Sequence, residues 1–182
     1  MMAEAAGAIE IDIRVEAAAW YGAVPSLEDS VEAAVRAALE FVDLSGPLFE
    51  LSILLTDNSA IAELNQEWRG KSGPTNVLSF PGESPAAVAA ENVSTDDGMP
   101  VLLGDIVIAC KTVRTEANAA GISINDHLQH LVVHGVLHLL GYDHEVDEDA
   151  DLMERCEIEI LGTLGVSDPY AAADRRLEHA PR

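Results

Sequence analysis

The sequence predicts an α+β fold in which about five helices pack on a mixed four-stranded sheet. Two observations support this fold class. Strand-like and helix-like segments alternate in the first half of the chain, whereas helical patterns dominate the second half. A chain of 182 residues, 48% of them apolar, is also large enough to bury one substantial core.

The first half of the chain is predicted to contain two strands and two helices. Residues 9–15 alternate apolar and polar side chains, as a half-buried strand does. Ser26 is the expected N-cap of the first helix, and Thr56-Asp57-Asn58 supplies capping residues for the second. In order, the four segments are a strand over 9–15, a helix over 27–41, a strand over 48–55 and a helix through Trp68.

The second half is predicted to contain two strands and three helices. Glycine and proline mark loops at 69–74 and 81–100, and Asn125 or Asp126 is the expected cap of the central helix. We expect strands over 76–80 and 103–108, followed by helices over 112–120, from about 126 to 140, and over 148–164. Residues 9–170 then form one domain, and 1–8 and 171–182 are expected to be flexible tails.

Composition excludes several classes of protein. The chain has no run of about 18 apolar residues and no basic N-terminal segment, so neither a membrane span nor a secretory signal is expected. Cys110 and Cys156 lack C-x-x-C spacing and are expected to be reduced core residues, which indicates a cytoplasmic protein. The net charge of −22 repels nucleic acid at long range, so individual cations carry more weight than usual.

Three histidines occur at H-x3-H-x5-H spacing in the segment 134–144. His134 and His138 are four residues apart on a predicted helix, so their side chains share one face. Gly141 can adopt the left-handed conformation that ends a helix and returns His144 toward the same point. Three imidazoles suit zinc and leave a fourth position open. We therefore expect one divalent ion per chain, most readily zinc, on a central helix and the turn after it.

This spacing matches that of the H-E-x-x-H-x-x-G-x-x-H zinc proteases with one change. The glutamate that serves those enzymes as general base is Gly135 here. The histidines are therefore present without the usual base. A zinc peptidase or another small hydrolase stays an alternative interpretation.

Three blocks in order resemble the YbeY endoribonuclease family. They are residues 64–71 with 74–81 (LNQEWRGK and PTNVLSFP), residues 103–108 (LGDIVI) and residues 134–144 (HGVLHLLGYDH). The resemblance implies a metal-dependent endoribonuclease specific for single-stranded RNA. Such an enzyme would act in ribosomal RNA processing, notably at the 3′ end of the small-subunit RNA, and in ribosome quality control. Ribosomal RNA and the small ribosomal subunit are the partners it implies. A non-catalytic ribosome-assembly factor with a structural metal stays a second alternative interpretation.

The resemblance also assigns site residues. His134, His138 and His144 match the metal ligands, and Arg69 matches a functional arginine in the family's cleft. A guanidinium there could hold a phosphate through two hydrogen bonds and offset charge in the transition state. The sequence leaves open whether water or the ribose 2′-hydroxyl attacks phosphorus.

Other polar residues near these blocks are candidates for supporting roles. Lys71 is as consistent with a solvated side chain as with a phosphate contact. His127 and His130 share the helical stripe of His134, and we expect them to lie at the surface or to support the ligands. Asp105 or Asp143 could orient a ligand imidazole through its second nitrogen.

Overall fold

The computed structural model describes residues 9–44, 48–82, 100–143 and 147–171. Four strands form one sheet in the order β1-β2-β4-β3. Strands β1, β2 and β4 run parallel, and β3 pairs antiparallel with β4, so the predicted mixed four-stranded sheet is confirmed. The strands are β1 (Ile9–Val15), β2 (Phe49–Thr56), β3 (Val77–Pro81) and β4 (Val101–Ala109).

The described residues form six helices, against the five expected. They are α1 (Ala19–Ala23), α2 (Leu27–Phe41), α3 (Asn58–Arg69), α5 (Cys110–Ala120), α6 (Ile124–Leu139) and α7 (Asp147–Thr163). The unforeseen helix, α1, is too short to show a helical period. It is held by Trp20, which is fully buried and donates its indole N–H to the carbonyl of Thr56, 3.2 Å away.

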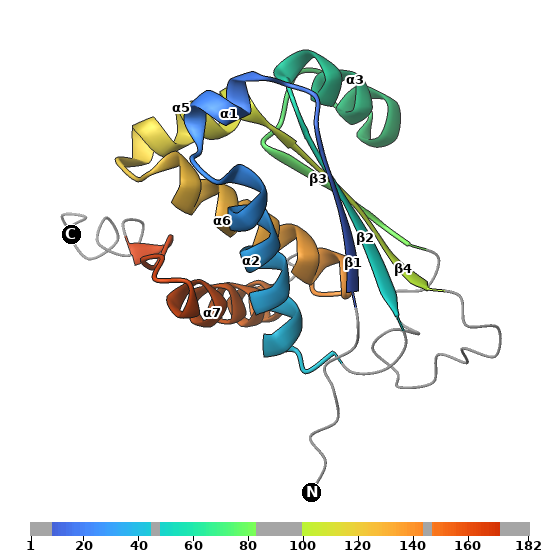
Figure 1. Cartoon of the computed structure of the whole chain (residues 1–182), viewed down its shortest axis with the longest axis vertical. Coiled ribbons are helices and arrows are strands. Elements are labelled where there is room, and N and C mark those ends of the chain that lie inside the picture. The colour runs from blue at the N-terminus through green and yellow to red at the C-terminus, as the bar shows by residue number, and fades with distance from the viewer. Residues whose placement is uncertain (1–8, 45–47, 83–99, 144–146, 172–182) are drawn as a thin grey trace, which may run out of the picture.

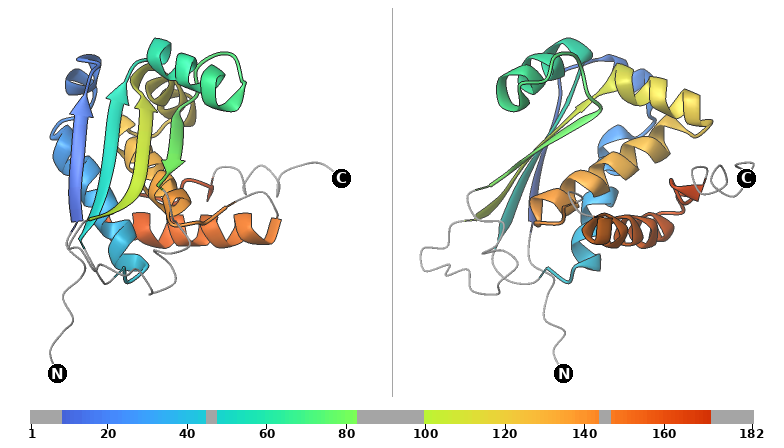
Figure 2. Two further views of the ribbon diagram at one scale, coloured as in Figure 1. Left: turned by 90° about the vertical axis from the view of Figure 1, so that its right-hand side faces the viewer. Right: turned by 180° about the vertical axis from the view of Figure 1, so that it is seen from behind.

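The two faces of the sheet are covered unequally. Helices α2, α5, α6 and α7 lie on one side, and α3 lies on the other (Figures 1 and 2). The period of two in the strands explains this division. In β2 and β4, Leu51, Ile53, Ile106 and Ile108 face the main core, while Val107 faces a small cluster with Ile61 of α3 and Leu78 of β3.

Capping differs from the expectation at two helices. Ser26 does precede α2, but it has a left-handed backbone (φ +51°) and its side chain makes no capping bond. The cap of α6 is Ser123, whose hydroxyl accepts from the backbone of Asp126 at 3.0 Å, and neither Asn125 nor Asp126 has that role. Asp57 caps α3 as predicted, accepting from two backbone N–H groups. Several residues can cap within one turn, and the chain path decides which does.

Both cysteines are free and buried, as expected, and burial raises the pKa of each thiol. Within the described residues no helix has the length and apolar character needed to cross a membrane. The tail proposed at 1–8, the tail proposed at 171–182 apart from Ala171, and most of the loop over 81–100 lie outside the described residues.

Helix α6 lies at the centre of the fold and packs on β4, β3, α2, α5 and α7. Its close approach to β4 depends on Gly135. A Cβ atom at this position would lie 2.8 Å from Cδ1 of Ile106 and 3.1 Å from its Cγ2. Residue 135 therefore points into the sheet and away from solvent, and the helix can approach this closely only without a side chain there.

We expect Gly135→Ala to lower the free energy of unfolding by a net of up to about 2 kcal/mol. Overpacking costs about 1–3 kcal/mol, and the better helix propensity of alanine offsets about 1 kcal/mol of it. Adding Ile106→Val should recover part of the loss, because it removes the Cδ1 atom that lies nearest. Urea denaturation of the two single variants and the double variant measures this coupling.

The matched control is Gly162→Ala near the end of α7, where no atom lies within 4 Å of the added Cβ. This exposed position should be stabilised by up to about 1 kcal/mol. If both glycine variants gained stability equally, the close packing of α6 on β4 would be wrong.

Candidate active site

Two predicted metal ligands lie together on α6. The Nε2 atoms of His134 and His138 are 3.1 Å apart, and the two rings stand nearly perpendicular with their centroids 4.5 Å apart. The i, i+4 spacing on one helical face produces this geometry, as the sequence predicted. Both histidines line the same cleft.

The opposite nitrogens of both rings contact acceptors. The Nδ1 atom of His134 lies 2.6 Å from Oε1 of Glu157, and Nδ1 of His138 lies 2.9 Å from the backbone carbonyl of Tyr142. A carbonyl and an ionised carboxylate can only accept, so each Nδ1 carries the proton. In the neutral rings each Nε2 then presents a lone pair. Two lone pairs 3.1 Å apart repel each other unless a cation lies between them, so this arrangement suits a shared cation.

The turn after α6 supplies one of these acceptors. Gly141 adopts φ +93°, its N–H donates to the carbonyl of His138, and the N–H of Tyr142 donates to the carbonyl of Leu137. These two bonds form a Schellman motif, which confirms the predicted role of Gly141. The turn aims the Tyr142 carbonyl back at His138. The third predicted ligand, His144, lies outside the described residues, and within those residues no group of three metal-binding side chains gathers.

Glu157 is the main residue that the sequence argument missed. It is fully buried in α7, where its carboxylate contacts His134, His130 at 3.3 Å and the hydroxyl of Tyr170. Burial alone would raise the pKa of Glu157, but hydrogen bonds from His130, His134 and Tyr170 outweigh it and lower the pKa from 4.5 to about 2. The carboxylate therefore stays ionised and accepts from His134.

A signal for Glu157 was present in the sequence. The buried positions of α7 follow the i, i+3, i+4, i+7, i+8 pattern, and they are Met153, Cys156, Glu157, Ile160 and Leu161. An ionisable residue in the centre of an apolar stripe requires a partner. The partner itself could not be predicted, because it lies on another helix.

The cleft brings Arg69 to the histidine pair. It encloses about 740 Å³ and is lined by the end of α3, by residues 75–81 leading into and along β3, by the histidine face of α6 and by the turn after it. Arg69 is the last residue of α3, which ends at Gly70 with φ +63°. The following loop is tied back by Asn65, whose Nδ2 donates to the carbonyl of Gly73 at 2.9 Å. Arg69 thus lies in the cleft as expected.

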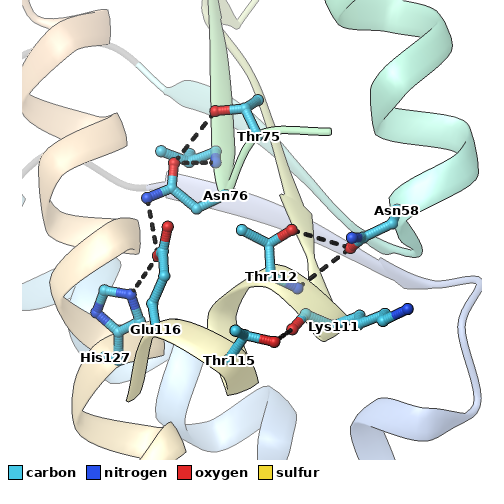
Figure 3. Close-up of polar contacts among 9 residues, drawn as sticks. Asn58, Thr75, Asn76, Lys111, Thr112, Thr115, Glu116 and His127 are labelled. Carbon is cyan, nitrogen blue, oxygen red and sulfur yellow. Dashed lines mark hydrogen bonds and ion pairs between the residues drawn. The ribbon is translucent and has the colours of Figure 1, made fainter. Parts of the chain in front are cut away.

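The β3 wall of the cleft is fastened to α5 and α6 (Figure 3). Asn76 accepts from the backbone N–H of Val77 at 2.7 Å and donates from Nδ2 to Glu116 at 3.1 Å. The same Glu116 oxygen lies 2.7 Å from Nε2 of His127. Because Asn76 also lines the cleft, this chain of contacts fixes the wall relative to the histidine helix.

The remaining candidates separate into those inside and those outside the cleft. Asp143 lines it, whereas Asp105 is exposed on the opposite face of the sheet and cannot orient either histidine. Lys71 is exposed and is not among the residues that line the cleft. His130 supports the site through Glu157, and His127 through Glu116, in keeping with the supporting role expected of them.

Comparisons with known proteins agree with this architecture. The family model described as "Endoribonuclease YbeY" matches residues 15–165. A protein named Endoribonuclease YbeY from Rhodospirillum rubrum is 52% identical over 161 residues, which cover 85% of this chain and 78% of that protein. One of the same name from Paramagnetospirillum magneticum is 46% identical over 162 residues, covering 89% and 96%.

A solved structure also shares the fold. A solution structure of a protein from Thermotoga maritima superposes with a TM-score of 0.52 at 24% sequence identity. The match covers 88% of this chain and 98% of that one. At this identity the likeness supports the arrangement of strands and helices.

We expect Tyr170→Phe to lower the free energy of unfolding by about 1–2 kcal/mol near neutral pH. The lost hydroxyl donates to an ionised carboxylate, and Tyr170 is only half-buried, so the lower part of the range for such bonds applies. The folded pKa of Glu157 lies below its ordinary value, so its contribution is present above about pH 4.5 and is lost as the pH falls toward 2. The difference from the unsubstituted chain should therefore shrink below about pH 4.5.

Urea denaturation in steps from about pH 7 down to about pH 2 measures both effects. Tyr142→Phe is the matched control, because the Tyr142 hydroxyl has no hydrogen bond within the described residues. A Tyr170→Phe loss that stayed constant across this range would contradict the ionised state of Glu157.

Proposed function

Because the chain belongs to the YbeY endoribonuclease family, we propose that it is a metal-dependent endoribonuclease specific for single-stranded RNA. Its proposed role is in ribosomal RNA processing, notably 3′-end maturation of the small-subunit RNA, and in ribosome quality control. One observation carries the chemistry. The Nε2 atoms of His134 and His138 converge in a cleft that also contains Arg69.

We propose that His134, His138 and His144 hold one divalent ion, with zinc as the first choice. The two histidines that the structure describes fit such an ion. Two nitrogens bound tetrahedrally at about 2.0–2.1 Å lie about 3.3–3.4 Å apart, and the observed separation is 3.1 Å. Both protons sit on Nδ1, as metal ligation through Nε2 requires. When bound, the ion would polarise a phosphate oxygen and acidify water.

The chain's own residues have distinct tasks in this proposal. Arg69 binds a non-bridging phosphate oxygen and stabilises the charge that grows there in the transition state. Glu157 and the Tyr142 carbonyl fix the ring orientation and the proton position of the two histidines. The fastened β3 wall keeps the far side of the cleft in place for the substrate.

Neither alternative function gains support from the geometry. A protease glutamate would have to replace Gly135, but this residue points at Ile106 in the sheet, so a carboxylate there would be buried. A structural metal is normally enclosed by protein ligands, whereas these histidines line an open cleft beside an arginine.

The charge of the chain bears on its partners. With 32 acidic and 10 basic residues, the protein is repelled by bare RNA, so we propose that it meets its substrate on the small ribosomal subunit in the cytoplasm. Basic ribosomal proteins there could dock its acidic surface. Equal affinity for naked RNA and for small-subunit particles at physiological salt would contradict this proposal.

We also propose that residues 9–170 form one domain. The hydrogen bond from Tyr170 to Glu157 supports this proposal, because it ties the end of this range to α7.

Two substitutions test the metal site. His138→Ala removes a proposed ligand and should abolish stoichiometric metal binding. Glu157→Gln leaves the ligands in place but weakens the acceptor for His134, so metal affinity should fall about 10–100-fold. Elemental analysis and competition with a chelator measure the two effects. Equal metal content in the parent protein and His138→Ala would rule out this assignment.

Arg69→Ala should lower the single-turnover rate of RNA cleavage about 10²–10³-fold while the metal content stays unchanged. Lysine should restore only part of the rate, because it lacks the planar guanidinium. The substrate is a single-stranded fragment of small-subunit RNA. Arg114→Ala is the control, since Arg114 is exposed on α5 and does not line the cleft. Near-parental cleavage by Arg69→Ala would remove Arg69 from the mechanism.

A further inference from the structure

Trp68 is the most exposed large apolar side chain in the described residues. It is 65% exposed, although tryptophan is usually among the most buried residues on average. The other tryptophan, Trp20, is fully buried. An indole held at the surface loses the free energy of burial, so its position calls for an explanation beyond the packing of the core.

The ring of Trp68 is held in place on one side. It meets Phe80 of β3 edge to face, with ring centroids 5.9 Å apart and planes inclined by 69°. Trp68 lines the cleft together with Arg69, His134 and His138. It also lines a second hollow of about 690 Å³ on the sheet face near α3. A supported indole between two hollows, with much of its surface in solvent, is suited to receive a flat ligand.

The electrostatics of the cleft favour a contact that does not depend on charge. Of the described residues that line it, Arg69 is the one lysine or arginine, and Asp143 is acidic. The whole chain carries a net charge of −22. Phosphate contacts alone therefore provide little affinity for RNA. Stacking of a base on an aromatic ring is nearly independent of charge and sequence, and it is the usual means of holding single strands.

We propose that Trp68 is a stacking platform for one unpaired base of the RNA substrate, next to the phosphate bound by Arg69. This inference rests on the proposed endoribonuclease function and specifies how its substrate is held. The two residues are neighbours in the chain and line the same cleft, so the proposal assigns the base and the phosphate to the same or to adjacent nucleotides. A base inside a duplex cannot stack on the ring, so the platform selects single-stranded RNA at the point of cleavage.

The test compares Trp68→Ala with Trp68→Phe and with Tyr21→Ala in the metal-loaded full-length protein. Tyr21 is the matched control, because it is 59% exposed on α1 and does not line the cleft. With a single-stranded fragment of small-subunit RNA, Trp68→Ala should raise the half-saturating enzyme concentration roughly 5- to 150-fold, as loss of one base stack does. Phenylalanine should restore most of the affinity, and Tyr21→Ala should change nothing.

Two further measurements separate stacking from a structural effect. Replacing single bases of the RNA by abasic sites, one position at a time, should weaken binding to the parent protein at one position and leave Trp68→Ala unaffected there. The loss caused by Trp68→Ala should be the same at low and at physiological salt, whereas the loss caused by Arg69→Ala should shrink as salt rises.

Intrinsic fluorescence provides a direct signal. RNA should quench the emission of Trp68, and the residual emission of Trp20 in Trp68→Phe should not respond to RNA. Parental affinity of Trp68→Ala for RNA, or equal losses at every abasic position in both proteins, would overturn the stacking role while leaving cleavage by the parent protein intact. Quenching through Trp68 without any cleavage would instead overturn the proposed function and preserve the platform.

Discussion

The approach of α6 to β4 at Gly135 is the contact on which the rest of the structure depends. Because no side chain separates the helix from Ile106, the backbone of α6 lies close to the sheet. The preceding residue, His134, points about 100° away around the helix and lines the cleft, and His138 follows one turn later. A larger residue at 135 would require either the Ile106 side chain or the helix to shift, and a shift of the helix would move both histidines relative to the β3 wall. A packing constraint in the core therefore fixes a distance in the site.

A buried carboxylate joins the second layer of helices to this site. Glu157 of α7 accepts from His134, and its ionisation is maintained by His130 and Tyr170 as well. Removing any one donor leaves the charge of this fully buried carboxylate less well compensated. The same interaction thus holds α7 against α6 and sets which nitrogen of His134 faces the cleft. Glu157 therefore contributes both to the packing of α7 on α6 and to the orientation of the His134 ring.

The acidic composition of the chain agrees with a cleft that would bind RNA through few cations and an exposed aromatic ring. A protein with a net charge of −22 cannot rely on a basic surface to collect its substrate. Of the described residues that line the cleft, Arg69 is the one arginine or lysine, and the exposed indole of Trp68 stands beside it. Such a site would combine one charged contact to a phosphate with base stacking, which salt does not screen. Long-range electrostatic attraction would then have to come from the basic surface of a partner.

The sequence by itself determined the parts that depend on local spacing. The i, i+4 histidines, the left-handed Gly141 and the strand periods each follow from the geometry of one element, and the structure agrees with them. The tertiary structure alone decided contacts between elements distant in the chain. Glu157 reaching His134, Glu116 linking Asn76 to His127, and the close contact of residue 135 with Ile106 all involve two or more elements. The hydrophobic pattern of one segment does not specify which other element will pack against it, because the packing partner depends on how the whole core is arranged.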